Sequence, residues 1–141
     1  MYKFTIYGEP KGKQRHRANG RVMYTPTQTR EYQRQVVQAY KAQYNGVYFN
    51  KGVPLGVKIK AVYKIPQSAS KKKQAQMLEG TILPTKKPDY DNIAKIITDA
   101  LNGVAFYDDA QVVYSSQLKV YGAIPRVEVT IGKINRINEG E

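Results

Sequence analysis

The strongest periodic pattern in the chain lies between residues 89 and 101, where it predicts one amphipathic helix. Five apolar residues recur at intervals of three and four, so that they share one helix face: Ile93, Ile96, Ile97, Ala100 and Leu101. Pro88 favours a helix start just after it, and Asn102 and Gly103 provide a stop. This helix therefore buries one face and leaves the opposite face for polar residues.

Four other segments have the patterns of β-strands. Residues 2–8 and 54–65 alternate apolar and polar side chains, which is typical of strands with one buried face. Residues 111–121 and 126–134 have the same character, and the Gly and Pro within 122–125 predict that they form a hairpin.

Two further helices complete the predicted order of elements. One covers about residues 27–44, and the other, short and basic, covers residues 70–80, where Ser70 begins the helix and Gly80 ends it. The order β-α-β-α-α-β-β predicts an α+β fold with helices packed on a mixed β-sheet. Residues 1–141 have the length of a single domain, in which we expect 134–141 to be a frayed tail.

The composition excludes several classes of protein. There are no cysteines, which excludes disulfide scaffolds and thiol nucleophiles, and the single His16 poorly supplies a histidine metal site or a catalytic triad. One domain leaves little room for a separate cofactor module, so we expect no organic cofactor. The N-terminal residues lack the apolar core of a signal peptide and no stretch is long enough to cross a bilayer, so we expect a cytoplasmic protein without membrane contact.

The chain is strongly basic, and its charges are unevenly distributed. It carries 23 Lys and Arg against 11 Asp and Glu, a net charge of +12. Such an excess favours nucleic acid or another acidic partner, although a basic pI alone equally serves solubility. Eighteen of the basic residues lie in residues 1–88, whereas five aspartates are concentrated between residues 89 and 109. The acids are therefore gathered in one short stretch of an otherwise basic protein.

Three basic segments are candidates for DNA binding. The segment 9–26 has the pattern of a long loop, which is either an arm that binds phosphate or a mobile, solvent-exposed loop. The lysines at 71–73 oppose the dipole of the helix that they begin; this favours a phosphate contact, while a solvated charge run is the simpler interpretation. The predicted DNA-binding residues are Lys11, Lys13, Arg15, Arg17, Arg21, Lys71, Lys72, Lys73, Lys86 and Lys87.

The aspartates have a spacing that can gather them around one site. Asp91, Lys95 and Asp99 are four residues apart and share the helix face opposite the isoleucines. A turn with two aspartates, the second of which is Asp109, precedes a strand that would run back along the helix. This topology can bring Asp109 near Asp89 and Asp91.

Hydrolysis of a phosphodiester is a reaction that this combination suits. Clustered carboxylates hold Mg²⁺, which neutralises the phosphate and activates water, and we predict Asp89, Asp91 and Asp109 as its ligands. Lys95 would stabilise the developing charge or orient the water. Taken singly, each acid also has a structural explanation: a helix cap, a surface ion pair or a turn. A calcium loop is discounted, because the glycine and the terminal glutamate that it requires are missing.

One run of residues carries a family resemblance. The pattern is Asp89-x-Asp91-Asn92-x-x-Lys95, then Asp99-Ala100-Leu101-Asn102, then Asp108-Asp109-Ala110-Gln111-Val112. It resembles the RusA family of Holliday-junction resolvases, common in bacteria and their prophages. The resemblance implies that cleavage depends on Asp89, Asp91, Lys95 and Asp109, with less defined roles for Asp99 and Asp108. It also implies Mg²⁺ dependence, with Mn²⁺ as a substitute, a homodimer and four-way branched DNA as the partner.

The sequence thus predicts an endodeoxyribonuclease that resolves Holliday junctions by paired, symmetric nicks in recombination and repair. A dimer suits this task, because a two-fold axis supplies two identical sites for cuts on opposing strands. Two alternatives stay open at this point. One is a basic DNA-binding module without catalysis, and the other is a metal nuclease that acts on other branched or duplex DNA.

Overall fold

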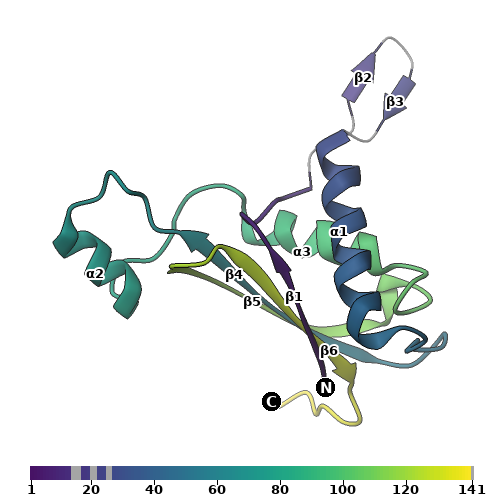
Figure 1. Cartoon of the computed structure of the whole chain (residues 1–141). Helices are drawn as coiled ribbons and strands as arrows, with labels where there is room; N and C mark the ends of the chain where they lie inside the picture. Colours follow the sequence, from purple (N-terminus) through teal and green to yellow (C-terminus); the bar gives the residue numbers. More distant parts are fainter. Residues whose placement is uncertain (14–16, 20–21, 25–26, 141) are drawn as a thin grey trace.

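A computed structural model describes residues 1–13, 17–19, 22–24 and 27–140 of the chain. It contains a four-stranded sheet, a two-stranded hairpin and three α-helices (Figure 1). The sheet strands are β1 (Tyr2–Tyr7), β4 (Leu55–Lys64), β5 (Val112–Gly122) and β6 (Arg126–Lys133). The hairpin strands are β2 (Arg17–Asn19) and β3 (Val22–Tyr24). The helices are α1 (Thr27–Tyr44), α2 (Lys71–Glu79) and α3 (Tyr90–Leu101), and a 3₁₀ turn, η1, covers Asp109–Gln111.

The sheet is mixed, with the strand order β1-β6-β4-β5. β4 pairs in parallel with β5 and antiparallel with β6, and β6 pairs antiparallel with β1. The predicted α+β fold with helices on a mixed sheet is therefore confirmed. The predicted hairpin between the last two strands is wrong, because β4 lies between β5 and β6.

The physical reason for this arrangement is the apolar character of β4. Its side chains are buried on both faces around Ala61–Tyr63, as a central strand requires, whereas a β5–β6 hairpin would place β4 at an edge. The short connection 123–125 reaches across the end of β4. Neighbouring strands lie about 5 Å apart and four residue steps extend to about 13 Å, so the chain can span two strand spacings.

The hydrophobic core lies between the sheet and helices α1 and α3, which contact each other. The predicted apolar face of α3 is confirmed, because Ile93, Ile96, Ile97 and Leu101 are fully buried. Helix α1 contributes Tyr32, Val36 and Tyr40 to the same core. The opposite face of α3 remains open to solvent.

Helix α2 extends away from this body, as Figure 1 shows. It begins and ends as predicted: Ser70 accepts a hydrogen bond from the backbone N–H of Lys73, and Gly80 adopts a left-handed conformation with φ of 89°. Only Met77 of the helix is buried, and the helix packs against β5. Its basic first turn is exposed.

The region 9–26 contains more structure than the predicted loop. Strands β2 and β3 pair there, with Asn19 opposite Val22. The sequence signal for this pairing is the dipeptide Asn19-Gly20, which is typical of tight hairpin turns. After Lys133, the part of the tail that the structure describes contains no helix or strand. Within the described residues, no helix combines the length and apolarity needed to span a bilayer.

Candidate active site

The start of α3 is held from two sides. On one side, the hydroxyl of the buried Tyr63 donates a 2.7 Å hydrogen bond to the carbonyl of Pro88, and burial together with the charge of Asp89 raises the pKa of Tyr63 to about 12. On the other side, Lys13 donates its backbone N–H to the carbonyl of Asn92 at 3.0 Å. These contacts fix where the helix face with Asp91, Lys95 and Asp99 points.

Three of the four predicted catalytic residues line one pocket of about 350 Å³ between α3 and the start of β5. Asp91 and Lys95 reach it from successive turns of α3, and Asp109 reaches it from η1. All three are exposed to solvent. The described structure thus brings together residues that are up to 18 positions apart in the sequence. We call the pocket that they line the acidic pocket.

Asp109 is the acid of this pocket whose ionisation is perturbed. Partial burial raises its pKa, and a hydrogen bond with Asp108 and the negative charges of Asp108 and Asp99 raise it further. Carboxylates that crowd one another in this way are stabilised by a cation placed between them. A cation near Asp109 would therefore favour its ionised form.

Asp89 lies outside the acidic pocket. It precedes the first turn of α3, makes no capping hydrogen bond with its side chain, and pairs with Lys87 at 3.0 Å. It lines a neighbouring pocket, which also contains Lys11, Lys13 and Lys87. The side chain of Asp89 therefore does not cap the helix. Asp89 and Asp91 line different pockets.

Asp99 is occupied by another partner. Its carboxylate accepts from the ammonium of Lys13, and both side chains are about three-quarters buried. The ion pair joins α3 to the segment that leads into the β2–β3 hairpin. Asp99 therefore connects α3 to the basic N-terminal segment.

A metal ion would find two carboxylates, rather than three, in the acidic pocket. Among the residues that the structure describes, no three Asp, Glu, His or Cys side chains lie close enough together to hold one ion. Mg²⁺ keeps several of its waters and is often bound by one or two carboxylates plus substrate phosphate. Asp91 and Asp109, open to water in one pocket, fit that requirement.

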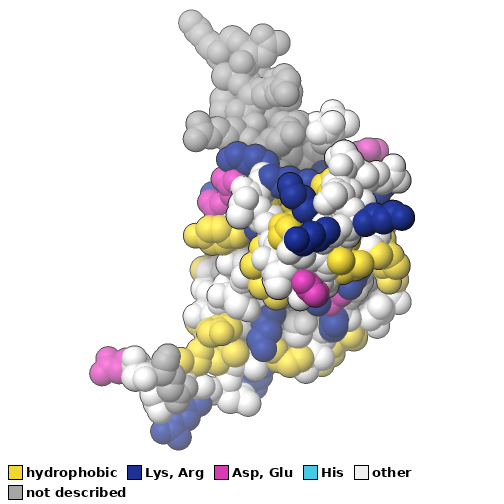
Figure 2. Space-filling view, turned by 90° about the vertical axis from the view of Figure 1, so that its left-hand side faces the viewer, with side chains coloured by type: hydrophobic (Ala, Val, Ile, Leu, Met, Phe, Trp, Pro, Cys, Tyr) yellow, Lys and Arg dark blue, Asp and Glu magenta, His cyan; other side chains and the backbone are white. Residues whose placement is uncertain are grey.

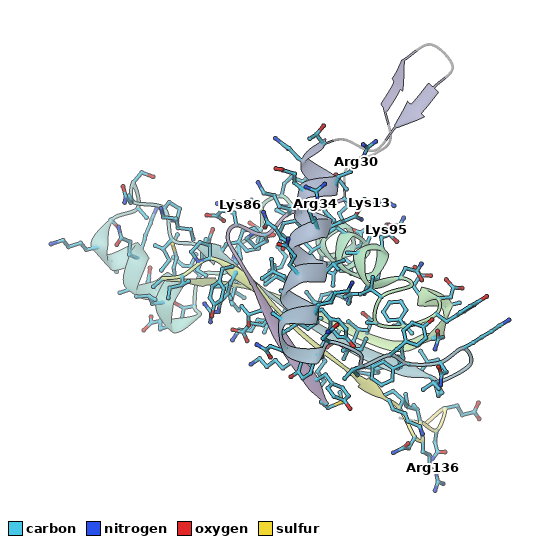
Figure 3. All side chains as sticks on the ribbon, turned by 45° about the vertical axis from the view of Figure 1, so that its right-hand side comes forward. Lys13, Arg30, Arg34, Lys86, Lys95 and Arg136 are labelled. Atoms are coloured by element: carbon cyan, nitrogen blue, oxygen red, sulfur yellow. The ribbon has the colours of Figure 1, made fainter. Side chains whose placement is uncertain are left out.

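Several basic side chains lie in the same half of the molecule as Lys95 of the acidic pocket. In Figure 3, Lys13, Arg30, Arg34, Lys86 and Lys95 lie in the upper half of the molecule, whereas Arg136 lies at the opposite end. Figure 2 shows several Lys and Arg side chains close together on the upper part of one face, with acidic side chains beside them.

Two of these residues were not predicted from the sequence. Arg30 and Arg34 are exposed on α1, one helical turn apart, next to the basic segment. Their spacing of four residues at the start of a helix was the available signal.

The other predicted DNA contacts have mixed surroundings. Lys86 lies 6.0 Å and 5.9 Å from the ring centres of Tyr63 and Tyr121, so part of its charge faces aromatic rings. Lys11 and Lys87 line the pocket that contains Asp89. Lys71, Lys72 and Lys73 are exposed on α2. Arg15 and Arg21 lie outside the described residues, and for Arg17 only the backbone strand is described.

The fold and the pocket together define a basic α+β protein with carboxylates and a lysine gathered on one exposed helix face. The sequence matches the family model of the endodeoxyribonuclease RusA over residues 7–132. It is also similar to YqaN, an uncharacterized protein of Bacillus subtilis (strain 168), with 37% identity over 138 residues that cover 94% of this chain and 96% of YqaN.

The chain belongs to the RusA family, as the resemblance of residues 87–113 indicated. Membership identifies it as an endodeoxyribonuclease of a family that resolves Holliday junctions and thus acts on branched DNA. The matched region includes helices α1 and α3, strands β4 and β5, and the acidic pocket between α3 and β5.

Proposed function

We propose that this protein is a Mg²⁺-dependent Holliday-junction resolvase that nicks two opposing strands of a four-way junction. One observation carries the proposal: Asp91, Lys95 and Asp109 line one solvent-open pocket in a basic member of the RusA family. A phosphodiester in this pocket would meet carboxylates for a cation and a lysine for the negative charge of the reaction.

The chain's own residues have separate roles in this proposal. Asp91 and Asp109 would hold the ion, and Asp89 remains the predicted third ligand. Its present partner, Lys87, is 84% exposed, and an exposed ion pair of this kind contributes little stability, so phosphate can replace the carboxylate as the partner of Lys87. The bound ion would supply charge neutralisation and activation of water. Lys95 would donate hydrogen bonds to the phosphate oxygens as charge develops there.

Backbone contacts would come from the basic residues around the pocket. Lys11, Lys13 and Lys87 lie beside the start of α3, and Arg30 and Arg34 extend the same side of the molecule. Each cation that meets a phosphate releases counterions, so binding would weaken steeply as salt is raised. These contacts would offset the repulsion between DNA and the acids of the site.

Two active sites are needed for paired nicks, and we propose that a homodimer supplies them. A two-fold axis places two identical pockets at a fixed separation, which matches the symmetry of a four-way junction. Analytical ultracentrifugation tests this part directly. A strictly monomeric protein that still nicks both opposing strands in one binding event would contradict it.

The decisive experiment compares a synthetic four-way junction with a linear duplex of the same sequence, each with and without Mg²⁺. We expect symmetric nicks in the junction alone, and only with the ion. Asp91→Asn should abolish cleavage and leave junction binding intact or tighter, because it removes a carboxylate that faces phosphate. Glu139→Gln is the matched control, since it removes an exposed carboxylate from the C-terminal tail.

Other outcomes of this experiment identify the competing functions. Binding without any cleavage would indicate a non-catalytic DNA-binding module. Equal cleavage of duplex and junction would indicate a nuclease of broader substrate range. Normal cleavage by the Asp91→Asn variant would show that the acidic pocket is not the catalytic site.

A further inference from the structure

A second pocket, of about 340 Å³, lies next to the acidic pocket and shares a wall with it. The wall is the segment 108–113, which contains η1 and the start of β5. Asp109 and Val112 face the acidic pocket, whereas Asp108 and Val113 face the second one. A strand of DNA whose phosphate entered the acidic pocket would therefore have a neighbouring nucleotide at the second pocket.

The two pockets are separated by an irregularity in β5. Leu55 of β4 pairs with Val112, but Gly56 pairs with Tyr114, so Val113 is an extra residue in the strand. Such a bulge re-aims a side chain that regular pairing would place on the sheet. Val113 is accordingly 57% exposed and lines the second pocket.

The second pocket is built by hydrogen bonds. The buried Gln111 donates its amide N–H groups to the carbonyls of Asn50 and Val53, at 2.8 Å and 3.0 Å. Its amide oxygen accepts from the backbone N–H of Asp108 at 2.9 Å. One side chain thus fixes the loop with Lys51 against the segment that carries the catalytic Asp109.

The pocket presents an aromatic face beside a cation. Tyr107 is 54% exposed although the preceding Phe106 is fully buried, so the core does not account for its ring. The ammonium of Lys51 lies 5.3 Å from the centre of that ring. A flat aromatic surface next to a lysine is suited to a nucleobase, which stacks on the ring while its phosphate meets the cation.

We propose that this second pocket binds one unpaired nucleobase of the DNA strand that is cut, with Tyr107 as the stacking platform. The proposal rests on the proposed function, because it requires a DNA strand in the acidic pocket. The volume is that of a small-molecule site, and the charged Lys51 and Asp108 that line it disfavour a protein contact, since the cores of protein interfaces are depleted in charge.

The test couples a protein residue to a DNA base. Junctions that lack one base at a time around the cut site are bound to the inactive Asp91→Asn protein, with and without Tyr107→Ala. At one position, loss of the base should weaken binding to the Asp91→Asn protein, the parent in this comparison, by about 5- to 100-fold. The same loss should not weaken binding to the protein that also carries Tyr107→Ala. Tyr107→Phe keeps the ring and should behave as the parent.

A matched control is Tyr48→Ala, which removes an exposed tyrosine outside the pocket and should leave the base-dependent loss intact. If Tyr107→Ala weakens all junctions alike, or none, the base pocket is refuted. A changed oligomeric state in the Tyr107→Ala protein refutes it in favour of a contact between subunits. Absence of junction cleavage by the unsubstituted protein with Mg²⁺ would overturn the proposed function itself, and the base pocket with it.

Discussion

Replacing Gln111 by Met tests whether one side chain holds the loop of residues 50–53 in place. Gln111 is only 8% exposed and takes part in three hydrogen bonds, with the carbonyls of Asn50 and Val53 and the N–H of Asp108. Methionine fills a similar volume but forms none of them. At about 0.5–1.5 kcal/mol for each bond, the free energy of unfolding should fall by about 2–4 kcal/mol.

Urea denaturation followed by circular dichroism measures this change. Gln38→Met is the control, because Gln38 is exposed on α1 and the same chemical change there should shift the free energy of unfolding by less than about 0.5 kcal/mol. If Gln111→Met were as stable as Gln38→Met, the three hydrogen bonds would not support the loop. Gln111 would then not hold the second pocket in shape.

Two further changes test the packing at the start of α3 and the ion pairs of the sheet. Gly12→Ala should lower the free energy of unfolding by about 1–3 kcal/mol in the same assay, because a Cβ at residue 12 would lie only 2.8 Å from the Cβ of Pro88. Gly140→Ala is the control, because Gly140 has open space around it and its substitution should leave the stability unchanged. Equal stabilities of the two variants would refute the close packing at Gly12. Burial opposes ionisation of Glu128, but hydrogen bonds from Arg126 and Lys3 outweigh it and lower its pKa. Glu128→Gln should therefore lower the free energy of unfolding by up to about 1 kcal/mol at pH 7. The difference in stability between the two proteins should disappear as the pH falls through the lowered pKa of Glu128. A difference in stability that does not depend on pH would exclude these ion pairs as its cause.

The parts of the fold that were predicted correctly are those whose signals are local. The apolar spacing of α3, the cap at Ser70 and the stop at Gly80 each depend on a few neighbouring residues. Strand pairing depends on distant ones. The segments of β5 and β6 are adjacent in sequence, and only the burial of β4 on both faces explains why it lies between them.

The same distinction explains the site. Helical spacing alone places Asp91 and Lys95 on one face of α3, and the structure has both in the acidic pocket. Asp89 is only two residues before Asp91, but it lies before the first helical residue, with an extended backbone (φ −69°, ψ 152°). The helical period therefore does not carry its side chain onto the same face. Asp109 joins the pocket instead through the packing of η1 and β5 against α3, which no spacing in the sequence encodes. Whether an acid lies in the acidic pocket thus depends on the element that carries it and on its neighbours: Asp99 is on α3 with Asp91, but it pairs with Lys13 instead. Proximity in sequence is a poor guide where a helix begins.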